Sequence, residues 1–436
     1  MSKVFTKIEW AKIGQRLAEH PTEYGLPKRV YGSFVLGSFN IRKLGRVSGR
    51  NSATWEFLAN VCRRFDLLAV QEVMGDLSGL RELLRRMGPE YDLVAFDKTG
   101  AFPGDKGLAE RLAFIFNRNL VTRREVATDI TYDRSKILHT LSKHHDGINE
   151  AVQEYGDYLN ASGKYAVMAA YWTQLDVYEE ALQVYEEKVH QATVAGTRKP
   201  PRSARPKKPS TKGLPKRPKL KMPKFLSFIR SPYCVSFEVN GHPGTQPLQF
   251  MAINAHLYFG NSMRDRWQEF DALMDWIIGR VKTNDDAYFP NYILLGDLNL
   301  DFNDPKADRR RMADRLKSFN DASGTATVVN FPFLDPHKGR SSVFRTNARL
   351  TETFDQFGFF CRDARFPAHT QNAEMDPAVS AVGPDYGVFD FADLFSEALV
   401  GKPVNELSPA EKKSFFPRFE HKVSDHMPLW VRLPLP

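Results

Sequence analysis

One short stretch limits what this chain can fold into more than any other. Residues 293–295 are three consecutive aliphatic residues, which predicts a strand buried on both faces. Gly296 follows, and then Asp297 and Asn299, two residues apart. Because side chains alternate along an extended chain, we expect this acid and amide to face one side at the edge of a sheet. The pair would hold a water or a metal-bound phosphate oxygen; the alternative is an ordinary Asn-containing turn.

Polar side chains at the ends of apolar segments recur along the chain. A lone histidine or acid beside a strand is more often structural than functional, so no single case is informative. Six such placements are hard to assign to chance and indicate one polar site built from strand ends. The further cases are Asn40 and Arg42 after 33–39, Glu72 after 66–70, Glu110 and Arg111 before 112–116, His256 after 250–253, and Asp425 and His426 before 428–431.

Together these segments resemble the endonuclease/exonuclease/phosphatase superfamily, and within it the DNase I-like proteins. The matching pieces occur in the family's order and cover about residues 31–128 and 226–436. As a set they are highly specific, although each alone is not. They are residues 39–42 (FNIR), 71–73 (QEV), 110–111 (ER), Arg230, 254–256 (NAH), 296–299 (GDLN), 354–356 (FDQ) and 424–426 (SDH).

The resemblance implies an α+β fold, a four-layer α/β/β/α sandwich of two mainly antiparallel sheets. The active site of such proteins lies where strands of both sheets end. Strands and helices that do not alternate strictly along the chain agree with this class. A helical-hairpin insertion would interrupt the sandwich.

The resemblance also implies a metal site. Glu72, Asn40 and Asp425 would hold the ion, while Asp297 and Asn299 would orient the attacking water or a second ion. Hard oxygen ligands favour Mg²⁺, or Mn²⁺ in its place.

Two histidines would flank the scissile phosphate. His426 would be held and kept cationic by Asp355, and Glu110 would pair with His256 in the same way. In one scheme the Asp355–His426 pair is the general base and the Glu110–His256 pair the acid. In another, Asp297 is the base and the histidines bind phosphate. We favour the second, because a carboxylate beside Mg²⁺ and water can act without a neutral imidazole.

The residues that would contact substrate match the family only in part. An arginine and a tyrosine that touch DNA in DNase I correspond here to Met74 and Leu108, so the geometry of the substrate can differ. The loop 335–340 is a second candidate surface, with an exposed polar loop as the alternative. The candidate substrate residues are Arg42, Arg111, Arg230, Asn299, Arg340, Arg345 and Thr346.

An insertion at residues 129–197 interrupts the family pattern. Its second half carries apolar residues at alternating steps of three and four, which predicts a coiled-coil-like helix. A looser stripe upstream predicts a first helix, and residues 160–163 separate the two. We expect a hairpin packed along its own seam; the alternatives are a dimer through the second helix or a groove for a protein partner. The seam residues are Met168, Tyr171, Leu175, Tyr178, Leu182, Tyr185 and Val189.

A basic, proline-rich linker follows at residues 198–225. It holds twelve Lys and Arg residues and no acids, and without them the net charge would change from +9 to −3. Proline spacing favours extended chain over helix. The linker would bind phosphate backbones with an affinity that falls with salt. The alternatives are a plain linker, a nuclear-import signal at 206–209 and 216–219, or contact with an anionic membrane.

The remaining features bound the organisation and location of the chain. Its 436 residues suit one large domain, residues 31–128 and 226–436, with the insertion and an N-terminal extension at 1–30. The extension carries Trp10, Ile13 and Leu17 at helical spacing. Three widely separated cysteines, no signal-like apolar start and no transmembrane-length apolar run favour an intracellular protein, cytoplasmic or, in a eukaryote, nuclear.

Three functions fit these features. The first is a metal-dependent DNA endonuclease, in which the basic linker favours a polyanionic substrate. The second is a phosphatase or phosphodiesterase acting on an inositol lipid, a sphingolipid or a nucleotide. The third is an inactive nucleic-acid-binding scaffold, against which the full set of acids and histidines argues.

Overall fold

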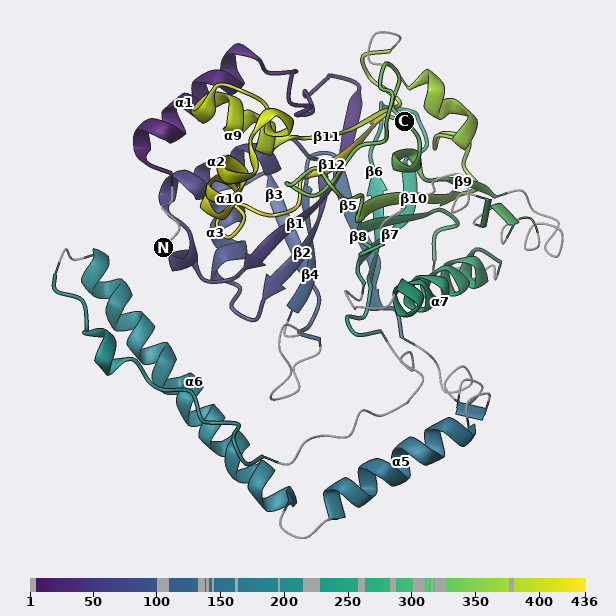
Figure 1. The fold of residues 1–436 in the computed structure, drawn as a ribbon. Helices are drawn as coiled ribbons and strands as arrows, with labels where there is room; N and C mark the ends of the chain where they lie inside the picture. Colours follow the sequence, from purple (N-terminus) through teal and green to yellow (C-terminus); the bar gives the residue numbers. More distant parts are fainter. Residues whose placement is uncertain are drawn as a thin grey trace. The chain divides into compact units, whose positions relative to one another are not determined.

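The structure is a computed structural model. It describes residues 5–99, 110–131, 145–160, 164–194, 197–214, 228–257, 263–282, 288–300, 327–375 and 380–436, with single positions between 138 and 142 and between 310 and 317. Two six-stranded sheets form its centre (Figure 1).

The first sheet has the strand order β11-β12-β1-β2-β4-β3. Neighbouring strands are antiparallel except β1 and β2, which are parallel. Its middle strands are almost wholly buried, as their continuous apolar runs predict. The strands are β1 (Ser33–Leu44), β2 (Leu67–Met74), β3 (Tyr91–Ala95), β4 (Glu110–Asn117), β11 (Asp385–Val388) and β12 (Leu429–Pro434).

The second sheet has the order β5-β6-β7-β8-β10-β9, and here β7 and β8 are the parallel pair. The other neighbours are antiparallel. The strands are β5 (Val121–Asp129), β6 (Tyr233–Val239), β7 (Leu248–His256), β8 (Tyr292–Asp297), β9 (Val328–Asn330) and β10 (Asp355–Cys361).

The two sheets pack face to face through large apolar side chains. Phe114 of β4 and Phe237 of β6 meet edge to face, with ring centroids 5.3 Å apart. Within the second sheet, Phe237 also lies 6.4 Å from Phe250 of β7 in a tilted arrangement. Such edge-to-face contacts between buried rings stabilise the core beyond the burial of their area.

Helices cover the outer faces of both sheets (Figure 1). Most of the described helices gather on the side of the first sheet, and α7 lies on the side of the second (Figure 1). The N-terminal helix begins with a capping box between Thr6 and Glu9 and contacts α9, so it is part of the sandwich. The helices are α1 (Lys7–Glu19), α2 (Ser52–Cys62), α3 (Ser78–Met87), α7 (Met263–Lys282), α9 (Phe391–Val400) and α10 (Pro409–Phe415). The predicted α/β/β/α sandwich of two mainly antiparallel sheets is therefore confirmed.

A second compact unit is formed by residues 102–106 and 132–227. Its described elements are α5 (His145–Asn160), α6 (Lys164–Val194) and the segment 197–214. Two helices thus occupy the interval in which a hairpin is predicted, and residues 161–163 between them lie outside the described part. Packing of one helix along the other stays a prediction.

Two smaller observations bear on the predicted location. Cys62, Cys234 and Cys361 are buried and free, so none is in a disulfide. None of the described helices combines the length and apolarity that crossing a membrane requires.

Candidate active site

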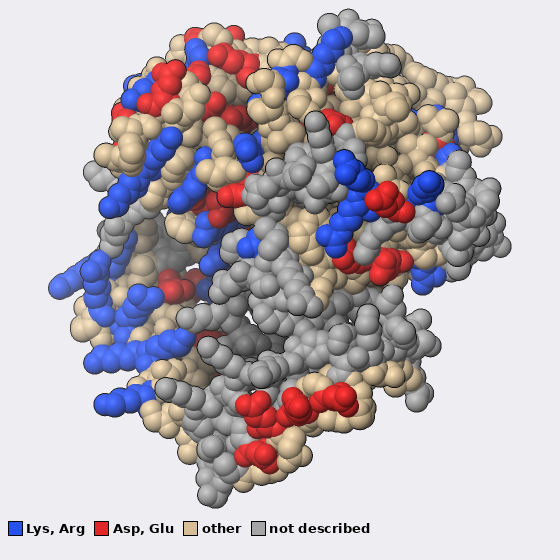
Figure 2. All heavy atoms as spheres, turned by 45° about the vertical axis from the view of Figure 1, so that its right-hand side comes forward, with Lys and Arg blue, Asp and Glu red and all other residues tan. Residues whose placement is uncertain are grey.

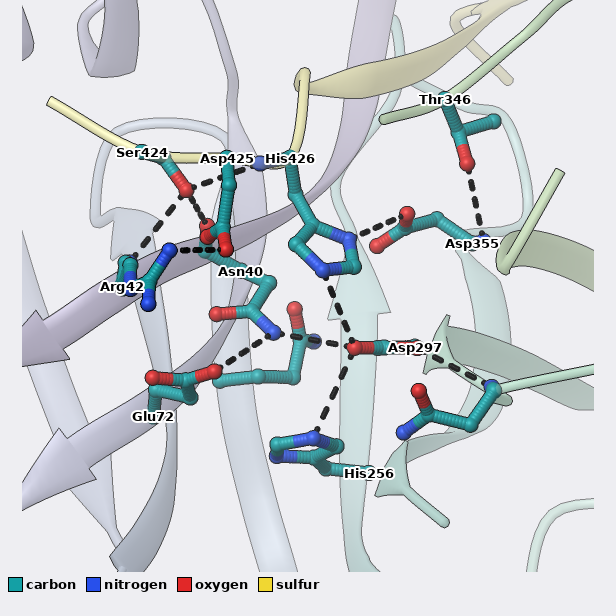
Figure 3. A network of polar contacts seen from close by, with 12 residues as sticks. Asn40, Arg42, Glu72, His256, Asp297, Thr346, Asp355, Ser424, Asp425 and His426 are labelled. Atoms are coloured by element: carbon teal, nitrogen blue, oxygen red, sulfur yellow. Dashed lines mark hydrogen bonds and ion pairs between the residues drawn. The ribbon is translucent and has the colours of Figure 1, made fainter. Parts of the chain in front are cut away.

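Strand ends from both sheets bring the predicted polar residues to one place (Figure 3). The pairing of three adjacent strands explains this for the second sheet. Asp297, the last residue of β8, is paired with His256 at the end of β7 and with Asp355 at the start of β10. Three segments that are distant in sequence therefore present an acid, a histidine and a second acid at one edge.

Asp297 is the centre of the cluster and is 1% exposed. Its Oδ2 accepts a hydrogen bond from Nδ2 of Asn40 at 3.0 Å and lies 3.5 Å from Nε2 of His256 and 3.6 Å from Nε2 of His426. Its Oδ1 accepts the backbone N–H of Asn299 at 3.0 Å. Asn40 and His426 belong to the first sheet side of the site, so Asp297 links the two sheets (Figure 3).

These contacts keep Asp297 ionised. Burial alone would raise the pKa of its carboxyl, but the positive charges of His426 and His256 and the amide donors outweigh burial and lower it. A buried carboxylate that stays charged between two imidazoles can orient a water or position both rings.

His426 is held by the second acid. Its Nδ1 lies 2.8 Å from Oδ2 of Asp355, which is 1% exposed. Burial alone would lower the pKa of His426, but the charges of Asp355 and Asp297 raise it well above its ordinary value. The pair fixes the ring with Nε2 directed at Asp297 and favours the protonated form of His426.

His256 is held in a similar way from the other side. Its Nδ1 lies 3.1 Å from Oε2 of Glu110, the first residue of β4. Burial raises the pKa of Glu110, but His256 and the guanidinium of Arg230 lower it overall. Nε of Arg230 lies 2.7 Å from the same oxygen, so Arg230 neutralises Glu110. The predicted phosphate-binding arginine is thus engaged with an acid of the site.

A second group of oxygens lies at the ends of β1 and β2. Nδ2 of Asn40 is 3.3 Å from Oε1 of Glu72, whose Oε2 accepts the backbone N–H of Lys43 at 3.0 Å. Glu72 has φ +56°, where a side chain other than glycine is strained, and the pairing of β2 shifts register beside it. This local distortion turns the Glu72 carboxylate out of the strand pleat.

Unsatisfied oxygens mark where a cation would fit. Oδ1 of Asn40 and Oδ1 of Asp425 are buried and find no hydrogen-bond partner among the described residues. Burial raises the pKa of Asp425, and the nearby charge of Glu72 adds to this, although His426 and Arg42 lower it. Buried acceptors without donors are costly, and a cation would satisfy them. With Glu72 they form an all-oxygen set, which suits Mg²⁺ or Mn²⁺.

A different trio also has donor atoms within 4.8 Å of one another, namely Asp297, Asp355 and His426. Here Asp355 and His426 already satisfy each other across 2.8 Å. A cation at this place would have to break that contact, so we favour the Asn40, Glu72 and Asp425 oxygens.

Two positioning elements could not be read from strand ends. The hydroxyl of Ser424 donates to the backbone oxygen of Asn40 at 2.6 Å and accepts the N–H groups of Arg42 and His426, which ties β1 to the loop before β12. Gln71 Nε2 donates to Oδ1 of Asn254 across the two sheets at 2.7 Å. Ser424 lies in the family motif 424–426 and Gln71 in the motif 71–73. Their place in these motifs is the sequence signal that could have identified them.

Asn299 reaches the site by a route other than the predicted alternation. β8 ends at Asp297, and Asn299 has φ +51°, so the chain is no longer extended there. Its backbone N–H binds Asp297, while its Nδ2 donates to the backbone oxygen of Leu257 at 2.8 Å. The reasoning from strand alternation was wrong, because the turn, not the pleat, places Asn299 beside Asp297.

Two predicted substrate arginines are paired with acids of the chain. Arg111 alternates with Glu110 along β4, so its Nη1 points away from Glu110 and binds Asp97 at 2.8 Å. Arg42 pairs with Asp425 inside the site. Leu108 lies outside the described residues.

The predicted substrate residues after residue 335 are of two kinds, one buried and two exposed. Thr346 is buried, and its hydroxyl accepts the backbone N–H of Asp355 at 3.1 Å, so it positions that acid. Arg340 and Arg345 are exposed, and Arg340 stacks over Phe344 at 4.4 Å.

Comparison with known proteins gives a fold but no close relative. No protein-family model and no curated protein matches the chain. Solved structures of endonuclease/exonuclease/phosphatase family proteins are similar to it, as the motifs predict. An endonuclease/exonuclease/phosphatase family protein from Bacteroides thetaiotaomicron is 12% identical, with a TM-score of 0.39, covering 93% of this chain and 98% of that one.

Two further structures give similar values. A mannosyl-6-phosphatase of Bacteroides thetaiotaomicron is 11% identical (TM-score 0.41; 91% of this chain, 98% of that one). The catalytic domain of human Nocturnin with bound sulfate is 12% identical (TM-score 0.40; 94% and 97%). At such identities and scores the likeness does not assign a substrate, and the chemistry has to come from the site itself.

Proposed function

We propose that this protein is a divalent-metal-dependent phosphodiesterase that hydrolyses DNA as an endonuclease. The observation that carries the proposal is the position of Asp297. It is a buried carboxylate with a lowered pKa, between two histidines that are each backed by their own acid. A structural ion pair needs one cation for one acid. This arrangement instead places two imidazole Nε2 atoms around one oxygen, with a cluster of unsatisfied oxygens close by.

The residues can divide the work of hydrolysis. Asp297 would take the proton of, or orient, an attacking water, because its carboxylate is ionised and held by Asn40 and Asn299. His426, cationic and fixed by Asp355, would stabilise charge on a nonbridging phosphate oxygen. His256, between Glu110 and Asp297, would do the same from the other side. Substitution of Asp297 tests whether this carboxylate or the Asp355–His426 pair is the general base.

Asn40, Glu72 and Asp425 would hold Mg²⁺, or Mn²⁺ in its place. When bound, such an ion supplies Lewis-acid stabilisation of the charge that develops on the phosphate and the leaving oxygen. The three residues bring two negative charges and one neutral carbonyl oxygen to that place, and Arg42 offsets the charge of Asp425 when no ion is present.

A phosphatase or phosphodiesterase acting on an inositol lipid, a sphingolipid or a nucleotide is the second candidate. The orientation of Arg111 favours it, since this arginine next to Glu110 is paired with Asp97 and points away from the site. In the third candidate, an inactive scaffold, the buried histidine–acid pairs would have no catalytic role.

One set of parallel assays distinguishes the three candidate functions. Pure protein is mixed with supercoiled plasmid, with phosphatidylinositol phosphate and sphingomyelin vesicles, and with mononucleotides, each in Mg²⁺ and in EDTA. Nicking of plasmid in Mg²⁺ that EDTA abolishes is the expected result. Intact plasmid with release of phosphate or headgroup from the small substrates would replace the proposal by the second candidate. DNA binding without any hydrolysis in Mg²⁺ or Mn²⁺ would refute enzyme activity.

A further inference from the structure

The apolar stripe of α6 is covered, although α6 is otherwise a solvent-exposed helix. Leu175 is 6% exposed, and Tyr171, Tyr178, Leu182, Tyr185 and Val189 are half-buried. On the opposite side of the same helix, Val177 and Val184 are 62% and 54% exposed. Among the other described residues of α6, Ala169 and Trp172 are half-buried, Ala192 is buried and the rest are exposed. A stripe that repeats every three and four residues therefore has a partner.

The proline-rich segment 197–214 is that partner. After α6 ends, the backbone N–H of Thr197 binds the carbonyl of Ala192 at 2.9 Å, which turns the chain. The segment then runs back beside α6 (Figure 1), and the Tyr185 hydroxyl donates to the carbonyl of Pro201 at 3.4 Å. Pro200, Pro206, Pro209 and Leu214 are half-buried, whereas every other residue of the segment is exposed. We call α6 and residues 197–214 the arm.

The half-buried prolines and the tyrosine stripe are chemically matched. Apart from a 3-10 turn at Arg202–Ala204 and a turn at 211–214, the segment has no internal backbone hydrogen bonds among its described residues. Such proline-rich chain loses little entropy when it is ordered. Flat aromatic rings are the usual surface on which such chain docks. Over the part that the structure describes, the predicted seam therefore carries a helix–polyproline contact, while packing of α5 along it stays a prediction.

This contact leaves the cations of the segment outward. All seven Lys and Arg residues between 197 and 214 are exposed, and within the described part of the chain none forms an ion pair. No acid lies between residues 197 and 224. Figure 2 shows Lys and Arg side chains projecting in rows at its left edge. The seven are Arg198, Lys199, Arg202, Arg205, Lys207, Lys208 and Lys212.

We propose that the arm is a binding surface for the phosphate backbone of a nucleic acid, in which α6 holds the basic segment as an ordered, extended array of cations. The choice of a nucleic acid rests on the phosphodiesterase activity proposed above. The existence of a polyanion-binding surface rests on the arm alone.

The shape of the array favours a nucleic acid over a membrane. Residues 202–204 form a short 3-10 turn, and the chain on either side of it is extended. At about 3.1 Å per extended residue and about 2 Å per residue of the turn, the chain from residue 198 to 212 spans at most roughly 40 Å, a line of charge that can follow a strand of phosphates. The segment has no exposed aromatic or large aliphatic side chain to insert among lipids, because Leu214, its single large aliphatic residue, is half-buried. Ordering by α6 also reduces the entropy that a flexible basic tail would lose on binding.

The first experiment measures binding of the full-length protein to a fluorescent 25-base-pair DNA in EDTA, from 50 to 300 mM KCl. The test variant carries Arg202→Gln, Arg205→Gln, Lys207→Gln and Lys208→Gln. We expect its affinity at 100 mM salt to fall by about 10-fold or more, and the slope of log Kd against log salt to decrease by about 3, since each phosphate contact contributes about 0.9. The matched control removes four exposed cations of the sandwich, by Lys7→Gln, Lys12→Gln, Arg81→Gln and Lys413→Gln.

The second experiment tests the scaffold. Tyr178→Ser with Tyr185→Ser removes two rings from the covered stripe, and Val177→Ser with Val184→Ser changes the exposed face at the same spacing. Because Ser, Tyr and Val have similar helix propensities, both pairs should leave α6 intact. We expect the tyrosine pair alone to speed tryptic cleavage within residues 198–214 and to weaken DNA binding about 3-fold with an unchanged salt slope. Equal cleavage in both pairs would refute the docked segment.

The outcomes decide between the alternatives. A salt slope that falls equally in the test and control variants, or in neither, would overturn the proposal, as would binding to phosphatidylserine vesicles without binding to DNA. Because binding is measured without metal, it is independent of catalysis. Salt-dependent DNA binding through the arm by a wild-type protein that hydrolyses neither plasmid nor bis-p-nitrophenyl phosphate would retain the arm and refute the proposed activity.

Discussion

The sandwich and the arm use the same kind of residue in opposite ways. In the sandwich, arginines meet carboxylates: Arg29 pairs with Asp66, Arg230 with Glu110, and Arg349 with Glu420, and each of these acids is buried. In the arm, the cations of the segment 197–214 are exposed and, in the described part of the chain, have no acid opposite them. A buried ion pair holds two segments of the fold together, whereas exposed like charges repel one another and are available to bind an anion.

The two regions also differ in how much the loss of one charge changes the free energy of unfolding. A buried acid that loses its cation retains an uncompensated charge in a medium of low polarity, which is strongly destabilising. An exposed cation is already solvated, so its removal changes the protein little and a partner's affinity much. The predictions below test this difference, beginning with the largest effect.

The largest effect is expected at the centre of the sandwich site. Asp297→Asn keeps the shape of the side chain but removes the charge between His256 and His426, so hydrolysis of plasmid should fall by about 10³-fold or more, roughly 4 kcal/mol in activation free energy. Near-normal hydrolysis by Asp297→Asn, together with a dead His426→Ala, would show that the Asp355–His426 pair is the base. Circular dichroism of both variants controls for folding.

A smaller effect is expected for a paired arginine far from the chemistry. Nη1 of Arg29 lies 2.9 Å from Oδ1 of Asp66, and the Asp66 side chain is 3% exposed. Arg29→Gln would leave that carboxylate buried without its cation, and because Arg29 is itself partly exposed we expect a loss of about 1–2 kcal/mol in the free energy of unfolding. Urea denaturation measures it; an unchanged midpoint would mean that water already satisfies Asp66.

The pH dependence of stability should report the protonation of another acid of the sandwich, Asp390. Burial, with the charge of Asp393 nearby, raises the pKa of Asp390 to about 7 from an ordinary value of 3.8. The folded state therefore keeps a proton that the unfolded state releases, so stability is lost as the pH rises from about 4 to about 7. Asp390→Asn has no proton to lose and still caps α9, as Asp390 does by accepting the N–H of Asp393.

We expect this substitution to stabilise the protein at pH 8 by about 1 kcal/mol and to have little effect at pH 5. Urea midpoints at the two pH values measure the difference. An equal shift at both pH values would assign the effect to capping and not to the proton.

The smallest effect on stability is expected in the arm. Arg202→Gln removes a cation that pairs with nothing in the described part of the chain, so the free energy of unfolding should change by less than about 0.5 kcal/mol. The comparison with Arg29→Gln, the same change of residue, is the direct test of the contrast between the regions. A loss as large as that of Arg29→Gln would show that Arg202 has an intramolecular partner.

Much of the site could be predicted because catalytic side chains sit where apolar strands end. Apolar runs identify β7 and β8, and the residues that follow them, His256 and Asp297, meet because parallel neighbours end at the same edge of a sheet. The prediction failed for Asn299, where a left-handed residue replaces the extended chain, and it could not separate Glu110 from Arg111, of which one faces the site and the other faces Asp97.

By itself, the sequence determined the sandwich, the order of its polar strand ends and the separate basic, helical insertion. These follow from local patterns of apolar residues, which fix what must be buried. Only the tertiary structure decided which charges neutralise each other, that Gln71 and Asn254 join the two sheets, and that the tyrosine stripe of α6 takes a proline-rich chain as its partner. Pairing depends on distances between residues far apart in the chain, and those distances exist only once the strands have packed.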